Sequence, residues 1–167
     1  MELYHIQFLF VVLCFLISLK SKEALLITAM LLTVCADYCL IISGWYTVGV
    51  AVFCAVQAAY IIRHTRKARW LRFLPLAVLP ALVVYFLTKD LLISIAVVYA
   101  QLLLLSVFAA FLYRKFLIIL GMLLFLLCDI CVALYNLGTP VSNLAFGLIW
   151  VFYAPSQMLL ATSSKPE

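Results

Sequence analysis

The sequence contains few charged residues. Only 10% of its 167 residues are Asp, Glu, Lys or Arg, whereas 69% are hydrophobic. The surface of a soluble domain is typically about 25–35% charged, and a chain of this composition could not supply such a surface. We therefore predict an integral membrane protein in which residues 1–167 form a single membrane domain.

Histidine is also scarce, because the chain has only His5 and His64. This argues against similarity to membrane hydrolases that bind zinc through several histidines at one depth. The sequence also lacks a Gly-x-Ser-x-Gly motif, which places a nucleophilic Ser on a sharp turn, and it has no candidate Ser–His pair within its apolar runs. Any catalysis would have to rest on Asp, Tyr, Gln and water.

Six cysteines all lie within apolar runs. Cys35 and Cys39 are four residues apart and Cys128 and Cys131 are three apart, which imitates the ligand spacing of a four-thiolate zinc site. Asp37, however, lies about 200° around a helix from both Cys35 and Cys39, and ionising thiols in a membrane costs free energy. We therefore interpret the cysteines as small apolar residues and expect neither a metal nor another cofactor.

Seven apolar runs suit helices that cross a bilayer, which need about 17–25 residues each. They cover residues 4–19, 24–42, 45–63, 71–88, 91–113, 116–136 and 144–162. In this layout ten of the eleven basic residues lie on one side, and only Lys89 lies on the other. Basic residues accumulate on the cytoplasmic side. We therefore predict an all-α polytopic bundle of about seven transmembrane helices, with the N-terminus outside and the C-terminus cytoplasmic.

The same distribution explains the net charge of +5 without nucleic acid, because the basic residues cluster at the ends of apolar runs. We expect no nucleic-acid partner. The expected surroundings are the lipid bilayer of the cell membrane, which the chain would cross several times.

Two acidic residues, Asp37 and Asp129, lie inside predicted spans. An ionisable residue in a membrane is costly and indicates a functional site by default, although a neutral Asp can also hold neighbouring helices together by a hydrogen bond. At a rise of 1.5 Å per residue, Asp37 lies about 6 Å and Asp129 about 4 Å outward of the centre of its span. The matched depth favours one site containing both.

Gln57 and Gln157 lie about 5–6 Å inward of the centres of the third and seventh spans, each of which follows a span that carries an Asp. This matching order suggests a parallel internal repeat, a feature of many transport folds. Tyr60, Tyr99 and Tyr153 lie on or near the polar faces of their spans. Together these five residues could line one polar cavity.

Four segments in a fixed order carry a family resemblance: LLTVCADYCLI, GVAVFCAVQAAYIIR, GMLLFLLCDICVAL and WVFYAPSQMLLA. They resemble the YhhN-like family, the lysoplasmalogenase family of membrane proteins. In that family a span ending in Gly-Asp or Ala-Asp precedes one with an aromatic…His/Gln…Tyr pattern, and a later Gly…Ser/Cys-Asp span precedes a final Tyr-x-x-x-Gln/His span. The resemblance covers about residues 24–162. The sequence departs from the family at Gln57, where many members have His.

The resemblance implies hydrolysis of the vinyl ether bond of lysoplasmalogens, which gives a fatty aldehyde and a glycerophospho-headgroup. Its partner would be a lysophospholipid or another lipid substrate. Cleavage begins with protonation of carbon and proceeds through an oxocarbenium ion, a task similar to that of the paired carboxyl groups in glycoside hydrolysis. This reading assigns acid and base catalysis to Asp37 and Asp129 in unassigned order. It assigns binding of substrate and orientation of water to Gln57, Tyr60, Tyr99, Tyr153 and Gln157.

Three other functions remain open at this point. A lipid-binding protein with the same fold would bind lysolipids without releasing aldehyde. A small-molecule transporter would couple the Asp pair to protons. A purely structural role would use the two carboxyl groups only to hold helices together.

Overall fold

The structure is a computed structural model that describes residues 3–65 and 74–163. Its elements are all helical, with no strand among those residues. The α-helices are α1 Leu3–Ser18, α2 Ala24–Asp37, α3 Tyr46–Thr65, α4 Leu74–Thr88, α5 Leu91–Tyr113, α6 Phe116–Asn136 and α7 Ser142–Thr162. A short 3-10 helix, η1 (Leu19–Ser21), extends α1, and a π-helical turn, η2 (Tyr38–Ile42), extends α2. The predicted all-α bundle of about seven helices is confirmed.

Six helices within the described residues are long and apolar enough to cross a membrane, and Val78–Thr88 forms a shorter apolar helix. The fourth predicted span, 71–88, begins outside the described residues. So do several basic residues used to predict orientation: Arg66, Lys67, Arg69, Arg72 and Lys165. The direction of the bundle relative to the two sides of the membrane therefore stays a prediction.

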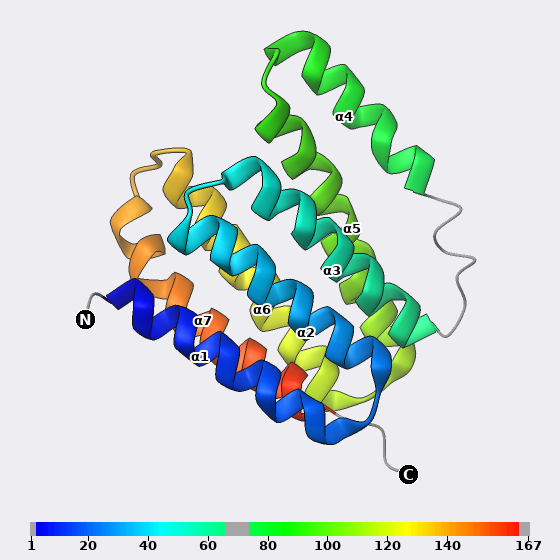
Figure 1. Cartoon of the computed structure of the whole chain (residues 1–167). Coiled ribbons are helices and arrows are strands. Elements are labelled where there is room, and N and C mark those ends of the chain that lie inside the picture. The colour runs from blue at the N-terminus through cyan, green and yellow to red at the C-terminus, as the bar shows by residue number, and fades with distance from the viewer. Residues whose placement is uncertain (1–2, 66–73, 164–167) are drawn as a thin grey trace.

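The helices form a closed ring. Helix α1 packs against α2 and α7, and the remaining contacts run from α2 to α3, α3 to α5, α5 to α6 and α6 to α7. Helix α4 packs against α5 and stands outside this ring (Figure 1). Its Leu79, Val83, Phe86 and Leu87 are exposed, as suits side chains that face lipid. The ring places one side of each of its six helices toward a shared interior.

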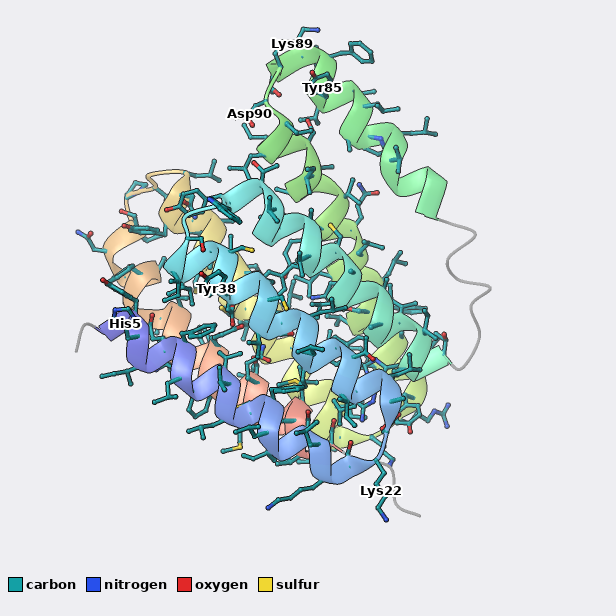
Figure 2. The ribbon with its side chains drawn as sticks, in the orientation of Figure 1. His5, Lys22, Tyr38, Tyr85, Lys89 and Asp90 are labelled. Atoms are coloured by element: carbon teal, nitrogen blue, oxygen red, sulfur yellow. The ribbon has the colours of Figure 1, made fainter. Side chains whose placement is uncertain are left out.

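Charged residues separate the two ends of the bundle. Figure 2 shows Lys22 at one end, far from Lys89 and Asp90 at the other. Asp90 caps α5, because its Oδ1 accepts hydrogen bonds from the backbone N–H groups of Leu92 at 2.8 Å and Ile93 at 3.2 Å. The end of the ring that carries Lys20, Lys22, Arg63, Arg114 and Lys115 is called the basic end below.

Two glycines allow helices to approach closely. A Cβ placed on Gly49 of α3 would lie 2.5 Å from Leu40 Cγ and 3.2 Å from the carbonyl oxygen of Ala36. A Cβ on Gly121 of α6 would lie 3.1 Å from Leu160 Cγ on α7. Small residues at such contacts are typical of membrane helices, where close van der Waals packing drives association.

We expect Gly49→Ala to lower stability, although Ala is normally the better helix residue. The added methyl group must displace Leu40 and approach a backbone carbonyl, and overpacking of this kind costs about 1–3 kcal/mol. Thermal unfolding in detergent measures the effect. The matched control is Gly147→Ala on α7, where a Cβ meets no atom within 4 Å. Equal midpoints for the two variants would contradict the close approach.

Candidate functional site

Two Asp–Tyr pairs lie in the interior of the ring. Tyr153 of α7 donates a hydrogen bond to Asp37 at the end of α2, and Tyr99 of α5 donates one to Asp129 of α6. Both carboxyl groups come from helices that run away from the basic end, and both phenols come from helices that run toward it. Each pair therefore joins neighbouring or facing helices of opposite direction. The first pair is buried, with Asp37 3% and Tyr153 7% exposed, and the second is half-buried.

The two pairs belong to one site. The Asp37 and Asp129 carboxyl groups are close enough to interact electrostatically, and Tyr153 lies within the same range of both. The buried Cys128 side chain is likewise within electrostatic range of both carboxyl groups. The assignment of Asp37 and Asp129 to one catalytic site stays a prediction, and the electrostatic range between their carboxyl groups is compatible with it.

Aromatic rings fill the space around the two pairs. Phe53 of α3 contacts the Tyr99 ring at 5.9 Å between centroids, and it contacts Phe125 of α6 at 6.0 Å. Phe125 in turn packs edge-on against Tyr153 at 5.9 Å. Trp150 lies 5.8 Å from Tyr153 on the other side. The carboxyl groups therefore sit in apolar surroundings, where charges interact more strongly than in water.

The backbone changes its winding immediately after Asp37. In the π-helical turn Tyr38–Ile42, the Ser43 N–H donates to the Tyr38 carbonyl oxygen at 3.0 Å, five residues back. Such turns occur mostly as single insertions and often at functional sites. Tyr38 is 48% exposed and packs against Phe8 of α1. The wider turn thus carries the residues after Asp37 outward while Asp37 itself stays buried.

The cysteines near Asp37 point elsewhere. Cys35 is exposed on the outer face of α2 and Cys39 is partly exposed, whereas Cys128 and Cys131 are buried. The predicted opposition of Cys35 and Asp37 on the helix is therefore confirmed, and the two cysteine pairs do not share a centre. Across residues 3–65 and 74–163, no three His, Cys, Asp or Glu side chains gather closely enough to hold a metal ion.

The remaining predicted site residues lie toward the basic end. Gln57 accepts a hydrogen bond from the Ser106 hydroxyl at 2.6 Å through its Oε1, and its side chain lies beside the Tyr99 hydroxyl. Tyr60 is fully buried and donates to Met30 Sδ at 3.4 Å rather than to either carboxyl group. Gln157 is fully buried on α7, one turn from Tyr153 toward the basic end.

A second polar cluster, at the basic end, was not predicted. Arg63 is 1% exposed, and its guanidinium donates to Glu23 Oε2 at 3.1 Å, to Ser163 Oγ at 3.1 Å and to the Ser163 carbonyl oxygen. It thereby ties the start of α2 and the end of α3 to the end of α7. The sequence does carry a signal for this ion pair, because Glu23 stands at the start of the second predicted span and Arg63 at the end of the third. Sequence reasoning assigned both to ordinary span ends.

The site therefore offers paired carboxyl groups, each with a phenol donor, inside a low-dielectric helical ring. Two neighbouring carboxyl groups in such surroundings can share a proton, so that one donates a proton while the other accepts one. This arrangement supports general acid–base chemistry on an apolar substrate. It includes no residue that the geometry marks as a covalent nucleophile.

Comparison with known proteins gives one match. A family model described as the YhhN family matches residues 4–164, which is nearly the whole chain. No curated protein and no solved structure matches the chain.

We expect the Asp37–Tyr153 pair to show energetic coupling. Tyr153→Phe removes only the hydroxyl that donates to Asp37, and loss of the partner of a buried carboxyl group costs about 1–3 kcal/mol. In an Asp37→Leu background the same change should cost almost nothing, because the acceptor is gone. Thermal unfolding of the four proteins in detergent gives the coupling free energy. Tyr38→Phe, on an exposed ring next to Asp37, is the control. Equal losses in both backgrounds would show that the hydroxyl acts elsewhere.

Proposed function

The chain belongs to the YhhN family, and we propose that it is a membrane hydrolase that cleaves the vinyl ether bond of lysoplasmalogens. The observation that supports this most directly is the convergence of two carboxyl groups, each bonded to a phenol, in the interior of one helical ring. Its substrate would be a lipid, and its place of action the cell membrane.

The proposed reaction needs one acid and one base. A carboxylic acid transfers its proton to the β-carbon of the vinyl ether, and the C=C electron pair forms the new C–H bond. The resulting oxocarbenium ion is attacked by water, while a carboxylate accepts a proton from that water. The hemiacetal then collapses: the first carboxyl group, now a carboxylate, takes the hydroxyl proton, the C–O bond to the glycerol breaks, and the second carboxyl group protonates the leaving oxygen, which gives a fatty aldehyde and a glycerophospho-alcohol. One water is consumed, and the carboxyl pair regains its starting protonation.

The roles of individual residues follow from this scheme. Asp37 and Asp129 supply the acid and the base. The phenols of Tyr153 and Tyr99 hold the two carboxyl groups in fixed orientation, because each donates a hydrogen bond to a carboxyl oxygen. Developing positive charge on the oxocarbenium ion would be stabilised by the carboxylate and by the faces of nearby aromatic rings such as Phe125. The chemistry needs neither a metal nor a covalent intermediate.

The surroundings of the site suit a lipid substrate. The exposed surface of the bundle is rich in large apolar side chains, so a lysolipid in the bilayer can approach without leaving hydrocarbon. The aromatic lining around the carboxyl groups would accept the first carbons of the alkenyl chain. The more polar part of the substrate would lie on the side of the basic end, next to Gln57, Tyr60 and Gln157.

Purified protein in detergent or nanodiscs should release fatty aldehyde from lysoplasmalogen and not from the matched acyl lysophospholipid, which lacks the vinyl ether. Asp37→Asn and Asp129→Asn should each reduce turnover by at least about 100-fold, since general acid–base groups typically contribute 10²–10⁴-fold. Aldehyde is measured by derivatisation and mass spectrometry.

The matched control is Asp90→Asn at the opposite end of the bundle from the basic end. Asp90 caps α5, and Asn is an equally good cap, so this variant should retain full turnover. Release of aldehyde that survives either substitution at the carboxyl pair would overturn the assignment. Binding of lysolipid without any release by the wild-type protein would instead favour a lipid-binding role.

A further inference from the structure

We propose that the interior of the ring, between the basic end and the carboxyl pair, binds a chain of water molecules that connects the two. This deepens the proposed function, because it names how hydrolytic water reaches a site within a membrane. The hydration itself does not depend on turnover and can be tested without it. The proposal rests on buried polar side chains, on the matched depth of two of them, and on their position between two polar clusters.

Gln57, Gln157 and His64 are among the described side chains whose buried polar atoms lack a hydrogen-bond partner of good geometry. Gln57 and Gln157 are fully buried and His64 is 4% exposed. The atoms concerned are Gln57 Nε2, both amide atoms of Gln157 and both ring nitrogens of His64. Gln57 also reaches the Tyr99 hydroxyl, and His64 the backbone of Ser106, with poorer hydrogen-bond geometry. A buried polar group without a partner costs about 1–3 kcal/mol. In native structures such groups are usually satisfied by protein or by ordered water.

The two Gln side chains lie in one layer of the bundle, and His64, seven residues beyond Gln57 on α3, lies about 10 Å nearer the basic end. Arg63 joins the end of α7 at Ser163, which fixes the relative depth of α3 and α7. Gln57 precedes Arg63 by six residues, and Gln157 precedes Ser163 by six. At 1.5 Å per residue, both amides therefore lie about 9 Å from the Arg63–Ser163 contact, toward the carboxyl pair.

The layer is continuous with the carboxyl pair. The side chain of Gln57 lies beside the hydroxyl of Tyr99, which donates to Asp129. On α7, Gln157 lies one turn from Tyr153, which donates to Asp37. On the side of each Gln that faces away from the basic end lies one of the two Asp–Tyr pairs.

The layer is also continuous with the basic end. His64 stacks on Tyr60 at 5.8 Å and lies beside the backbone of Ser106, whose hydroxyl donates to Gln57. Arg63, the neighbour of His64 in the chain, also has a buried atom, Nε, without a hydrogen-bond partner within the same described residues. Polar groups therefore follow one another from Arg63 through His64, Ser106 and Gln57 to the carboxyl pair.

Water fits these groups better than a charged ligand does. Their donors and acceptors are mixed, because amides and an imidazole offer both kinds of atom. The charge on the basic side of these groups, on Arg63, is already paired with Glu23 at 3.1 Å. A phosphate or ammonium group would find no unpaired counter-charge in this layer. A buried water typically makes about three hydrogen bonds to otherwise unsatisfied groups, which is what these side chains provide.

Thiol labelling tests the proposal directly. Ser106→Cys places a thiol of nearly the same size within the polar layer. Ala29→Cys is the control, because Ala29 is fully buried among apolar residues of α2 and lies six residues from Glu23, at the same depth by the same rise. Both variants are treated with aminoethyl methanethiosulfonate, a charged reagent that reacts with the hydrated thiolate. Peptide mass spectrometry locates the label among the native cysteines.

A hydrated layer predicts that the thiol from Ser106→Cys is labelled at least about tenfold faster than the thiol from Ala29→Cys, because the thiolate is the reactive form and apolar burial suppresses it. Equal rates would overturn the proposal. If Ser106→Cys does not give a monodisperse protein, Gln157→Cys serves as the second position with the same control and the same expected ratio. Fast labelling in a protein that releases no aldehyde would retain the water chain and reject the hydrolase function.

Discussion

A polar group in hydrocarbon must find its partner within the protein, and this constraint shapes every part of the bundle. Water cannot compensate an exposed N–H, carbonyl or carboxyl group there, so each one costs several kcal/mol if left alone. The hydroxyls of Thr33 and Ser156 satisfy this requirement locally by donating to carbonyl oxygens of their own helices. Arg63 satisfies it at long range through Glu23 and Ser163. The same requirement brings Asp37 to Tyr153 and Asp129 to Tyr99.

These long-range partners explain why the site lies where it does. A carboxyl group on a lipid-facing helix can be satisfied only toward the interior, so each Asp turns its face of the helix inward. The ring then concentrates polar side chains in its centre and leaves Leu, Val and Phe outside. The same contacts can serve stability and the proposed acid–base catalysis, because a carboxyl group that accepts a hydrogen bond from a phenol at one oxygen keeps its second oxygen free for proton transfer. Stability and the proposed activity therefore draw on the same contacts.

Much of this could be predicted from the sequence, and the reasons are physical. Apolar runs report span length directly. The predicted fifth and sixth spans coincide with α5 and α6, and the predicted second span coincides with α2 and η2 together. The similar depth of Asp37 and Asp129 was enough to predict that they share a site, although it could not show that they face each other. The hydrogen-bond partners of the two carboxyl groups could not be predicted, because depth alone does not say which helices face each other. Nothing in the sequence distinguished Tyr99 and Tyr153, which hold the carboxyl groups, from Tyr60, which bonds Met30. The buried role of Arg63 was missed because its neighbours in sequence are ordinary basic residues of a span end.

The closed ring has a consequence for how the protein is made. Helix α1 meets α7, so the ring closes only when the last helix has entered the membrane. Until then Asp37 has no Tyr153, which follows it by 116 residues, and Arg63 has no Ser163. A partly synthesised chain thus carries an incompletely satisfied carboxyl group and guanidinium in hydrocarbon. Arrival of the C-terminal helix supplies both missing partners at once. Entry of α7 is therefore the step that closes the ring and brings these Asp–Tyr and Arg–Ser contacts together.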